Sequence, residues 1–129
     1  NRRDVFRVRL ASPRGSRIEM ASEGEGGERT ASSMEAQLVD LSIRGCAVRV
    51  SLGLAVESKI SVDIPLTNGV VTIESRVMNV TPPSEFDECW RLGLRFEALS
   101  REQEELMWAE VMECQRKALK EVSERRVVL

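Results

Sequence analysis

The sequence predicts a mainly β fold, in which six to seven short antiparallel strands form a β-barrel or sandwich and one long α-helix follows at the C-terminus. Apolar residues alternate with polar ones in several short segments up to residue 96, which is the period of a half-buried strand. After Ser100 the apolar spacing changes to three and four residues, which is the period of a helix. A length of 129 residues fits one domain over 1–129, with an Arg-rich arm and first strand over 1–10, a barrel over 11–98 and a helix over 100–126.

The N-terminal third predicts two strands and a long loop. Alternation over 5–10 predicts the first strand, Pro13 and Gly15 predict a turn, and 16–20 predicts a second strand. Residues 21–33 are rich in Gly, Glu and Ser and show no periodicity, so we expect a loop without regular structure there.

The middle of the chain carries the clearest alternation. Asn68 and Gly69 predict a hairpin turn, and the Pro82-Pro83 pair predicts a break in the chain. The predicted strands of this region are 34–40, 46–50, 60–64, 71–77 and 90–96.

The C-terminal segment predicts one amphipathic helix. Ser100 and Gln103 form a candidate capping box at its start. Its apolar stripe, which we expect to cap the barrel, consists of Met107, Val111, Cys114 and Ala118, flanked by Trp108, Met112 and Leu119. We expect the distal part of the helix to pack on a partner or on another subunit.

Composition excludes several functional classes. The chain has no His, which excludes Ser-His-Asp triads, HExxH zinc sites and Cys-His proteases. Three Cys at spacings that fit neither disulfides nor a metal site indicate buried thiols in a reducing compartment. We expect no enzyme activity, no metal, no cofactor and no membrane span. The first residue is Asn1 rather than Met, so we expect a fragment of a longer protein.

Arginine dominates the basic residues. Sixteen of the 19 basic residues are Arg, and six of them lie before Glu19, whereas the net charge of the whole chain is −2. Because Arg recognises phosphates and guanine edges with two parallel hydrogen bonds, the N-terminal segment predicts an anionic partner. The acidic balance of the whole chain argues against a nucleic-acid polymer as that partner.

Two short motifs carry the chemistry. Arg3-x-x-x-Arg7 places two guanidinium groups on one face of a strand, about 13 Å apart, where they can hold an extended anion. The same spacing recurs at Arg91 and Arg95, so the pair alone is also compatible with chance.

The second motif is Asp40-x-Ser42-x-x-Gly45. Its carboxylate and hydroxyl are suited to the adjacent N–H donors of a guanine edge, and glycine permits a sharp turn or a close approach. The structural alternative is an Asx or Ser turn that closes a hairpin.

Taken together, these motifs resemble the PilZ domain family. The resemblance rests on NRRDVFRV at 1–8, DLSIRGC at 40–46 and RLGLRF at 91–96, and it covers about residues 1–100. It implies a small antiparallel β-barrel that binds cyclic di-GMP. The residues implied as ligand-binding are Arg2, Arg3, Arg7, Asp40, Ser42, Gly45 and Gly93. Within that set, Arg3 and Arg7 would contact phosphates and guanine edges, Asp40 and Ser42 would bind a guanine, and Gly45 would shape the loop.

The resemblance carries three further implications. Arg2, directly before the Arg pair, implies two intercalated cyclic di-GMP molecules instead of one. The acidic, Gly-rich stretch over 22–29 departs from the family pattern, and we interpret it as a hairpin insertion away from the site. The Arg-rich entry and the long helix are similar to the C-terminal half of flagellar brake proteins, which implies a bacterial cytoplasmic protein that changes domain orientation on binding and engages the flagellar motor at the basal body.

Several alternatives stay open from the sequence. The chain is also compatible with a protein-interaction domain that keeps only a vestigial ligand site, or with a PilZ regulator of exopolysaccharide synthesis or pili. Gly93 either admits a ligand or marks a strand kink, and Arg91 and Arg95 either flank the ligand or form a solvated face. The parity of Trp90 favours core packing over stacking on a base. The sequence leaves the oligomeric state open.

Overall fold

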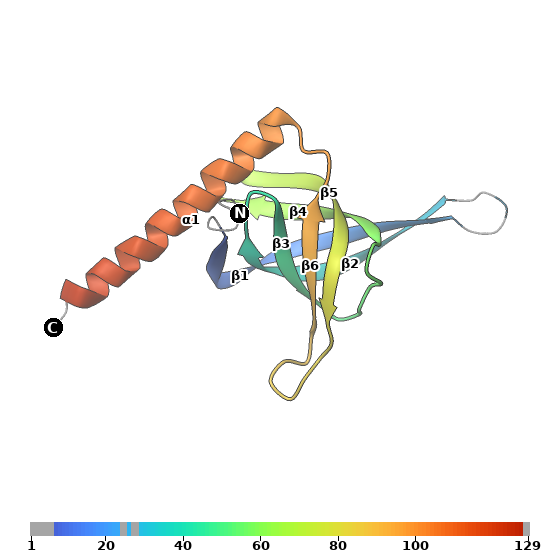
Figure 1. Ribbon diagram of the computed structural model, residues 1–129, viewed down its shortest axis with the longest axis horizontal. Coiled ribbons are helices and arrows are strands. Elements are labelled where there is room, and N and C mark those ends of the chain that lie inside the picture. The colour runs from blue at the N-terminus through green and yellow to red at the C-terminus, as the bar shows by residue number, and fades with distance from the viewer. Residues whose placement is uncertain (1–6, 24–25, 27–28, 128–129) are drawn as a thin grey trace.

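Six antiparallel strands close into a barrel, and one long helix follows them in the computed structural model (Figure 1). The structure describes residues 7–23, 26 and 29–127. The elements are β1 (Val8–Glu23), β2 (Arg29–Leu41), β3 (Gly45–Val50), β4 (Lys59–Leu66), β5 (Gly69–Thr81), β6 (Trp90–Phe96) and α1 (Arg101–Val127). The order around the barrel is β1-β2-β3-β6-β5-β4, which confirms the predicted fold class with six strands.

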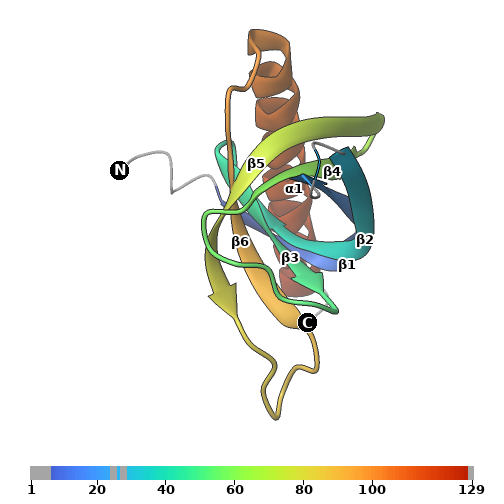
Figure 2. The same cartoon turned by 90° about the vertical axis from the view of Figure 1, so that its right-hand side faces the viewer.

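The alternating segments fill the barrel as their period predicts. In β4 and β6 one parity is buried and the opposite parity is more exposed, whereas in β3 every residue except Arg49 is buried. Figure 2 shows the strands curled around the interior, with α1 beside them. The interior is aliphatic, and its fully buried side chains include Ile18, Leu38, Val48, Val62, Ile73 and Leu92. Trp90 packs against this cluster, as its parity predicts.

The predicted turn at Pro13 and Gly15 is wrong, because β1 runs through both residues. The strand changes register with β2 between Arg9 and Arg14, and Pro13 lies inside that irregularity. A proline is tolerated there because it has no N–H group, and no ladder hydrogen bond is required of it at an irregular position.

The predicted loop over 21–33 is also wrong at 21–23 and 29–33, which are strand, whereas Gly26 lies in a turn. Residues Ala21 to Glu23 pair with Ala31 to Arg29, so the two strands extend as a ribbon beyond the barrel (Figure 1). Ladder hydrogen bonds use only the main chain, so a segment without apolar periodicity can still form paired strands. The pairing of these described residues agrees with a hairpin over 22–29, whereas its position relative to the ligand site stays a prediction.

The helix begins as predicted. The Gln103 N–H donates to Ser100 Oγ at 3.1 Å, and the Ser100 N–H donates to Gln103 Oε1 at 3.0 Å, which confirms the capping box. Met107 and Val111 are fully buried, but Trp108 is 45% exposed. Only the first half of α1 lies against the barrel, and the second half extends away from it (Figure 1). Ala118 and Leu119 are therefore exposed, in the distal part for which we expect a partner, whereas the expectation that Trp108 caps the barrel is wrong.

A buried carboxylate joins the helix to the barrel. Glu110 is 6% exposed, and it accepts hydrogen bonds from the backbone N–H and the hydroxyl of Thr67 in the β4–β5 turn. Arg14 forms an ion pair with the same carboxylate at 3.4 Å. Burial acts to raise the pKa of Glu110, but the hydrogen bonds from Thr67 and the charge of Arg14 outweigh it and lower the pKa. We call Arg14, Thr67 and Glu110 the helix junction.

Candidate functional site

Two of the predicted site residues, Asp40 and Gly93, belong to a row that crosses the outer face of four adjacent strands. Asp40 of β2 is opposite Ala47 of β3, Ala47 is opposite Gly93 of β6, and Gly93 is opposite Asn79 of β5. These four residues form a row across the sheet. The row has small residues in its centre and polar residues at both ends, and the Asn79 amide lies over Gly93, so a flat ligand reaches the strands when the side chains over the centre move aside.

Asp40 is the buried charge of this face. It is 5% exposed, and its Oδ2 accepts a hydrogen bond from Arg91 Nη2 at 3.0 Å. Its Oδ1 lies 3.5 Å from Arg7 Nη1, and no group in the described part of the chain donates a hydrogen bond to that oxygen. A buried acceptor without a donor is costly, so Oδ1 is the atom at which a ligand donor would gain most.

Arg7 partly covers this oxygen from the start of the chain. It directly precedes β1, and its side chain is 53% exposed. A half-exposed arginine in a long ion pair is weakly held, so Arg7 can leave Asp40 for an incoming anion. Arg2 and Arg3, the other predicted arginines, lie outside the described residues.

Ser42 has a local role that the ligand interpretation did not require. Its backbone N–H donates to the Gly45 carbonyl oxygen at 2.9 Å. Its hydroxyl accepts from the Gly45 N–H and donates to the Gly45 carbonyl, both at 3.1 Å. The hydroxyl therefore closes the β2–β3 turn, which is the Ser-turn alternative, and it fixes the backbone that follows Asp40.

Both glycines of the site have close neighbours, but only at Gly45 is that neighbour backbone. A Cβ atom at Gly45 would overlap the backbone carbonyl of Leu94 in β6, because the two strands approach closely there. A Cβ atom at Gly93 would overlap the side-chain amide of Asn79. Close approach therefore accounts for both positions, and at Gly93 the neighbour is the Asn79 side chain, which lies over the centre of the row.

Arg91 and Arg95 share the outer face of β6 but differ in their partners. Arg91 binds Asp40, whereas Arg95 makes no side-chain hydrogen bond or ion pair within residues 7–23, 26 and 29–127. On the neighbouring strand β3, Arg49 donates hydrogen bonds of 2.6 and 3.1 Å to the carboxylate of Asp87. The sequence left the roles of Arg91 and Arg95 open because the register that brings Arg91 to Asp40 joins segments far apart in the chain.

The thiol beneath this face is chemically inert. Cys46 lies inside the barrel, and its burial raises the pKa well above the usual value, with Asp40 acting in the same direction and Arg7 opposing it. A thiol that keeps its proton at neutral pH is no nucleophile, so Cys46 acts as a packing residue.

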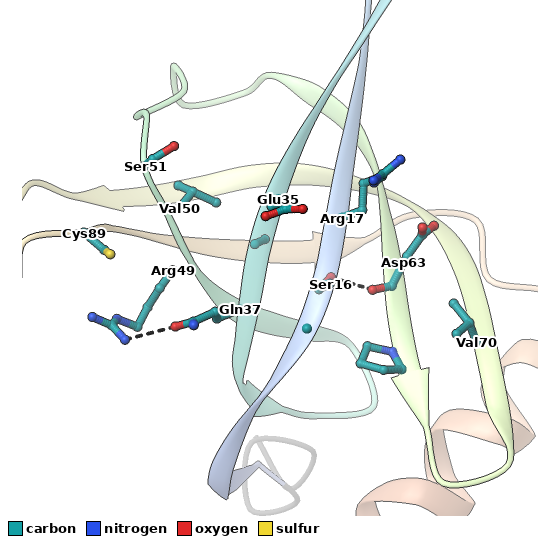
Figure 3. Close-up of a pocket in the computed structure, with 13 residues that line it drawn as sticks. Ser16, Arg17, Glu35, Gln37, Arg49, Val50, Ser51, Asp63, Val70 and Cys89 are labelled. Carbon is teal, nitrogen blue, oxygen red and sulfur yellow. Dashed lines mark hydrogen bonds between the residues drawn. The ribbon is translucent and has the colours of Figure 1, made fainter.

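A groove elsewhere on the molecule is a second candidate site. A groove of about 680 Å³ lies over β1, β2 and β4 (Figure 3). Its lining includes the carboxylates of Glu35 and Asp63, while Arg49 points to Gln37 and is also held by Asp87. This balance of charge offers an anionic ligand little attraction, so the groove is a poorer candidate than the row at Asp40.

The structure also bears on metals and membranes. No group of three or more Cys, Asp or Glu side chains in the described part of the chain is arranged to hold a metal ion. No described helix is both long enough and apolar enough to cross a bilayer.

Comparison with known proteins points to one family. A family model described as PilZ domain matches residues 1–113. The structure is similar to the PilZ domain with c-di-GMP of YcgR from Escherichia coli, with a TM-score of 0.67 and 16% identity over 92% of this chain and 95% of that one. No match was found among curated proteins.

Two longer proteins contain a similar unit. The MrkH–c-di-GMP complex of K. pneumonia matches with a TM-score of 0.65 and 16% identity, and Bacillus subtilis inhibitor of motility (MotI/DgrA) matches with 0.63 and 16%. The matches cover 89% and 88% of this chain but only 53% and 50% of those proteins, so this chain spans about half their length. At 16% identity, these structural similarities show a shared fold and no more.

Proposed function

This chain belongs to the PilZ domain family, and from that premise we propose that it is a receptor domain for cyclic di-GMP. The ligand class is suggested by the family, by the row of small residues on the outer face and by the arginines around it. YcgR and MrkH, whose structures are similar, are described with c-di-GMP.

The observation that carries the proposal is the unmatched Oδ1 of Asp40. A guanine presents two adjacent N–H donors, on N1 and on the exocyclic amine, and a carboxylate can accept both. Arg7 lies 3.5 Å from this oxygen without a hydrogen bond. We infer that the guanine replaces Arg7, and that the released guanidinium binds a phosphate of the same ligand.

This exchange would connect binding to the position of the N-terminal segment. Arg7 directly precedes β1, and Arg2 and Arg3 precede Arg7. A ligand that draws these arginines onto the barrel favours one arrangement of the segment over others. With three arginines available, we propose that two intercalated cyclic di-GMP molecules are bound.

The biological output we propose is control of flagellar motility. This rests on the resemblance of the Arg-rich entry to flagellar brake proteins and on the similarity to MotI/DgrA, which is described as an inhibitor of motility. The protein would then act in the bacterial cytoplasm without catalysis, and the ligand-bound state would be recruited to a flagellar motor protein at the basal body.

Calorimetric titration with cyclic di-GMP tests the receptor function, with cyclic di-AMP and GTP as controls. We expect saturable binding of cyclic di-GMP at about two molecules per chain, and no comparable binding of either control. One molecule per chain would keep the receptor function and reject the intercalated pair. Absence of binding, in this chain and in a version extended before Asn1, would support a protein-interaction domain instead.

A further inference from the structure

Arg91 and Arg95 form a natural matched pair. They are identical side chains on the same face of β6, separated by Gly93 and two inward-facing leucines, and both are exposed residues. Only Arg91 contacts Asp40, with a hydrogen bond and ion pair of 3.0 Å. The difference between them is therefore a difference of partner and not of type or exposure.

The contact of Arg91 crosses a whole strand. Asp40 is in β2 and Arg91 is in β6, while β3 lies between them. The outward residue of β3 next to Asp40 is Ala47, which is 3% exposed although it does not belong to the interior cluster. Its small side chain leaves room for an arginine to pass over β3, and the covering side chains account for its burial.

The two arginines at Asp40 hold different oxygens with different strength. Arg91 donates a hydrogen bond to Oδ2 at 3.0 Å, whereas Arg7 lies 3.5 Å from Oδ1 and makes no hydrogen bond to it. A carboxylate has lone pairs for about four donors, so an arginine on Oδ2 leaves room for a guanine. A hydrogen bond to a charged donor also fixes the plane of the carboxylate before the ligand arrives.

We propose that Arg91 is a positioning residue that orients Asp40 for guanine recognition and stays on it when the ligand binds. This rests on the proposed function, and it separates Arg91 from Arg7, which leaves Asp40 for the ligand. Arg91 then acts through Asp40 and contributes to the choice of base, not to the binding of phosphate. Arg95 does not contact Asp40 and has no role in orienting it.

A double-mutant cycle on cyclic di-GMP affinity tests this directly. We expect Arg91→Gln to weaken binding about 10-fold and Asp40→Asn about 100-fold, with the double variant no weaker than Asp40→Asn alone. Arg95→Gln, the matched control, leaves affinity within about 2-fold of the wild type. Additive losses, about 1000-fold in the double variant, would mean that Arg91 contacts the ligand independently and would overturn the proposal.

A ligand analogue gives a second readout that a merely structural role would not move. Cyclic di-inosine monophosphate keeps the phosphates and the N1 proton but lacks the exocyclic amine. We expect the wild type and Arg95→Gln to prefer cyclic di-GMP, and Arg91→Gln to lose most of that preference. An unchanged preference in Arg91→Gln would overturn the proposal.

The same measurements separate this inference from the proposed function. A wild type that binds cyclic di-GMP but shows additive losses rejects only the role of Arg91. A wild type that binds no cyclic di-GMP rejects both. The thermal midpoint of each variant, measured without ligand, is expected to stay within a few degrees of the wild type, so that a loss of affinity is not a loss of fold.

Discussion

Two carboxylates of this protein are almost equally buried, yet their surroundings differ. Glu110 is 6% exposed, and both of its oxygens accept hydrogen bonds from Thr67 while Arg14 supplies a charge. Asp40 is 5% exposed, but only one of its oxygens has a hydrogen-bond donor in the described part of the chain. Burial alone therefore does not identify a site, because the saturated acid joins two parts of the fold and the unsaturated one can receive a ligand.

Asp40 can stay unsaturated only if the backbone around it is rigid. Substitution of the two nearby glycines tests this rigidity, and it should give the largest change in the free energy of unfolding. We expect Gly45→Ala to lower the free energy of unfolding by about 3 kcal/mol, because its Cβ would overlap a backbone carbonyl of β6 that cannot move alone. Gly93→Ala meets only the exposed end of Asn79, so we expect less than about 1 kcal/mol. Urea unfolding measures both, and equal losses would contradict this account of the site.

Removing the charge of Asp40 separates binding from stability. We expect Asp40→Asn to cost about 2.7 kcal/mol of cyclic di-GMP binding, which corresponds to the 100-fold loss of affinity. Its free energy of unfolding should change by less than about 1 kcal/mol, since the wild-type Oδ1 has no hydrogen bond to lose. A variant that unfolds while keeping its affinity would reverse the roles of the two carboxylates.

The same replacement at Glu110 should have the opposite pattern. We expect Glu110→Gln to lower the free energy of unfolding by about 2 kcal/mol, because an amide nitrogen cannot accept from Thr67. Its affinity for cyclic di-GMP should match the wild type. Glu113→Gln is the control: Glu113 pairs with Arg116 on the helix surface, so we expect a change of at most about 0.5 kcal/mol.

Acid should weaken the helix junction selectively. The pKa of Glu110 is lower in the folded chain than its ordinary value of about 4.5, so folding favours the ionised form. Its contribution to stability is therefore complete above about pH 4.5 and is lost as the pH falls through the folded pKa. We expect the difference in free energy of unfolding between the wild type and Glu110→Gln to become smaller as the pH falls below about 4.5. Urea unfolding at a series of pH values measures it, and a constant difference would contradict the role of Glu110.

Local patterns in the sequence were sufficient for most of the barrel. The alternation over 46–50, 60–64 and 90–96 predicts β3, β4 and β6, because one face of each strand is buried. The capping box at Ser100 also predicts the helix start, since its two hydrogen bonds are local. Local signals failed at Pro13 and over 21–33, where strand pairing follows from a partner strand and not from composition.

The site divides in the same way. Asp40, Ser42 and Gly45 are recognisable from the sequence because they lie in one short motif. The ion pair of Arg91 with Asp40 depends on the order of three strands, and that of Arg14 with Glu110 joins the two ends of the chain. No local pattern encodes either contact. The exposure of Trp108 was missed for a related reason, since the face of the helix that meets the barrel is set by the tertiary contact that buries Met107 and Val111.

The seam that closes the barrel has a consequence for folding kinetics. β1 meets β4 through only three register pairs, Arg17 with Asp63, Ile18 with Val62 and Glu19 with Ser61. The paired residues are far apart in the chain, so joining them costs more loop entropy than forming the hairpins on either side. We therefore expect the seam to form later and to open earlier than the hairpins, with the amides of β4 that face β1 exchanging hydrogen faster than those of β4 that face β5. Kinetically, the barrel is a curled sheet whose two edges meet at the end of folding.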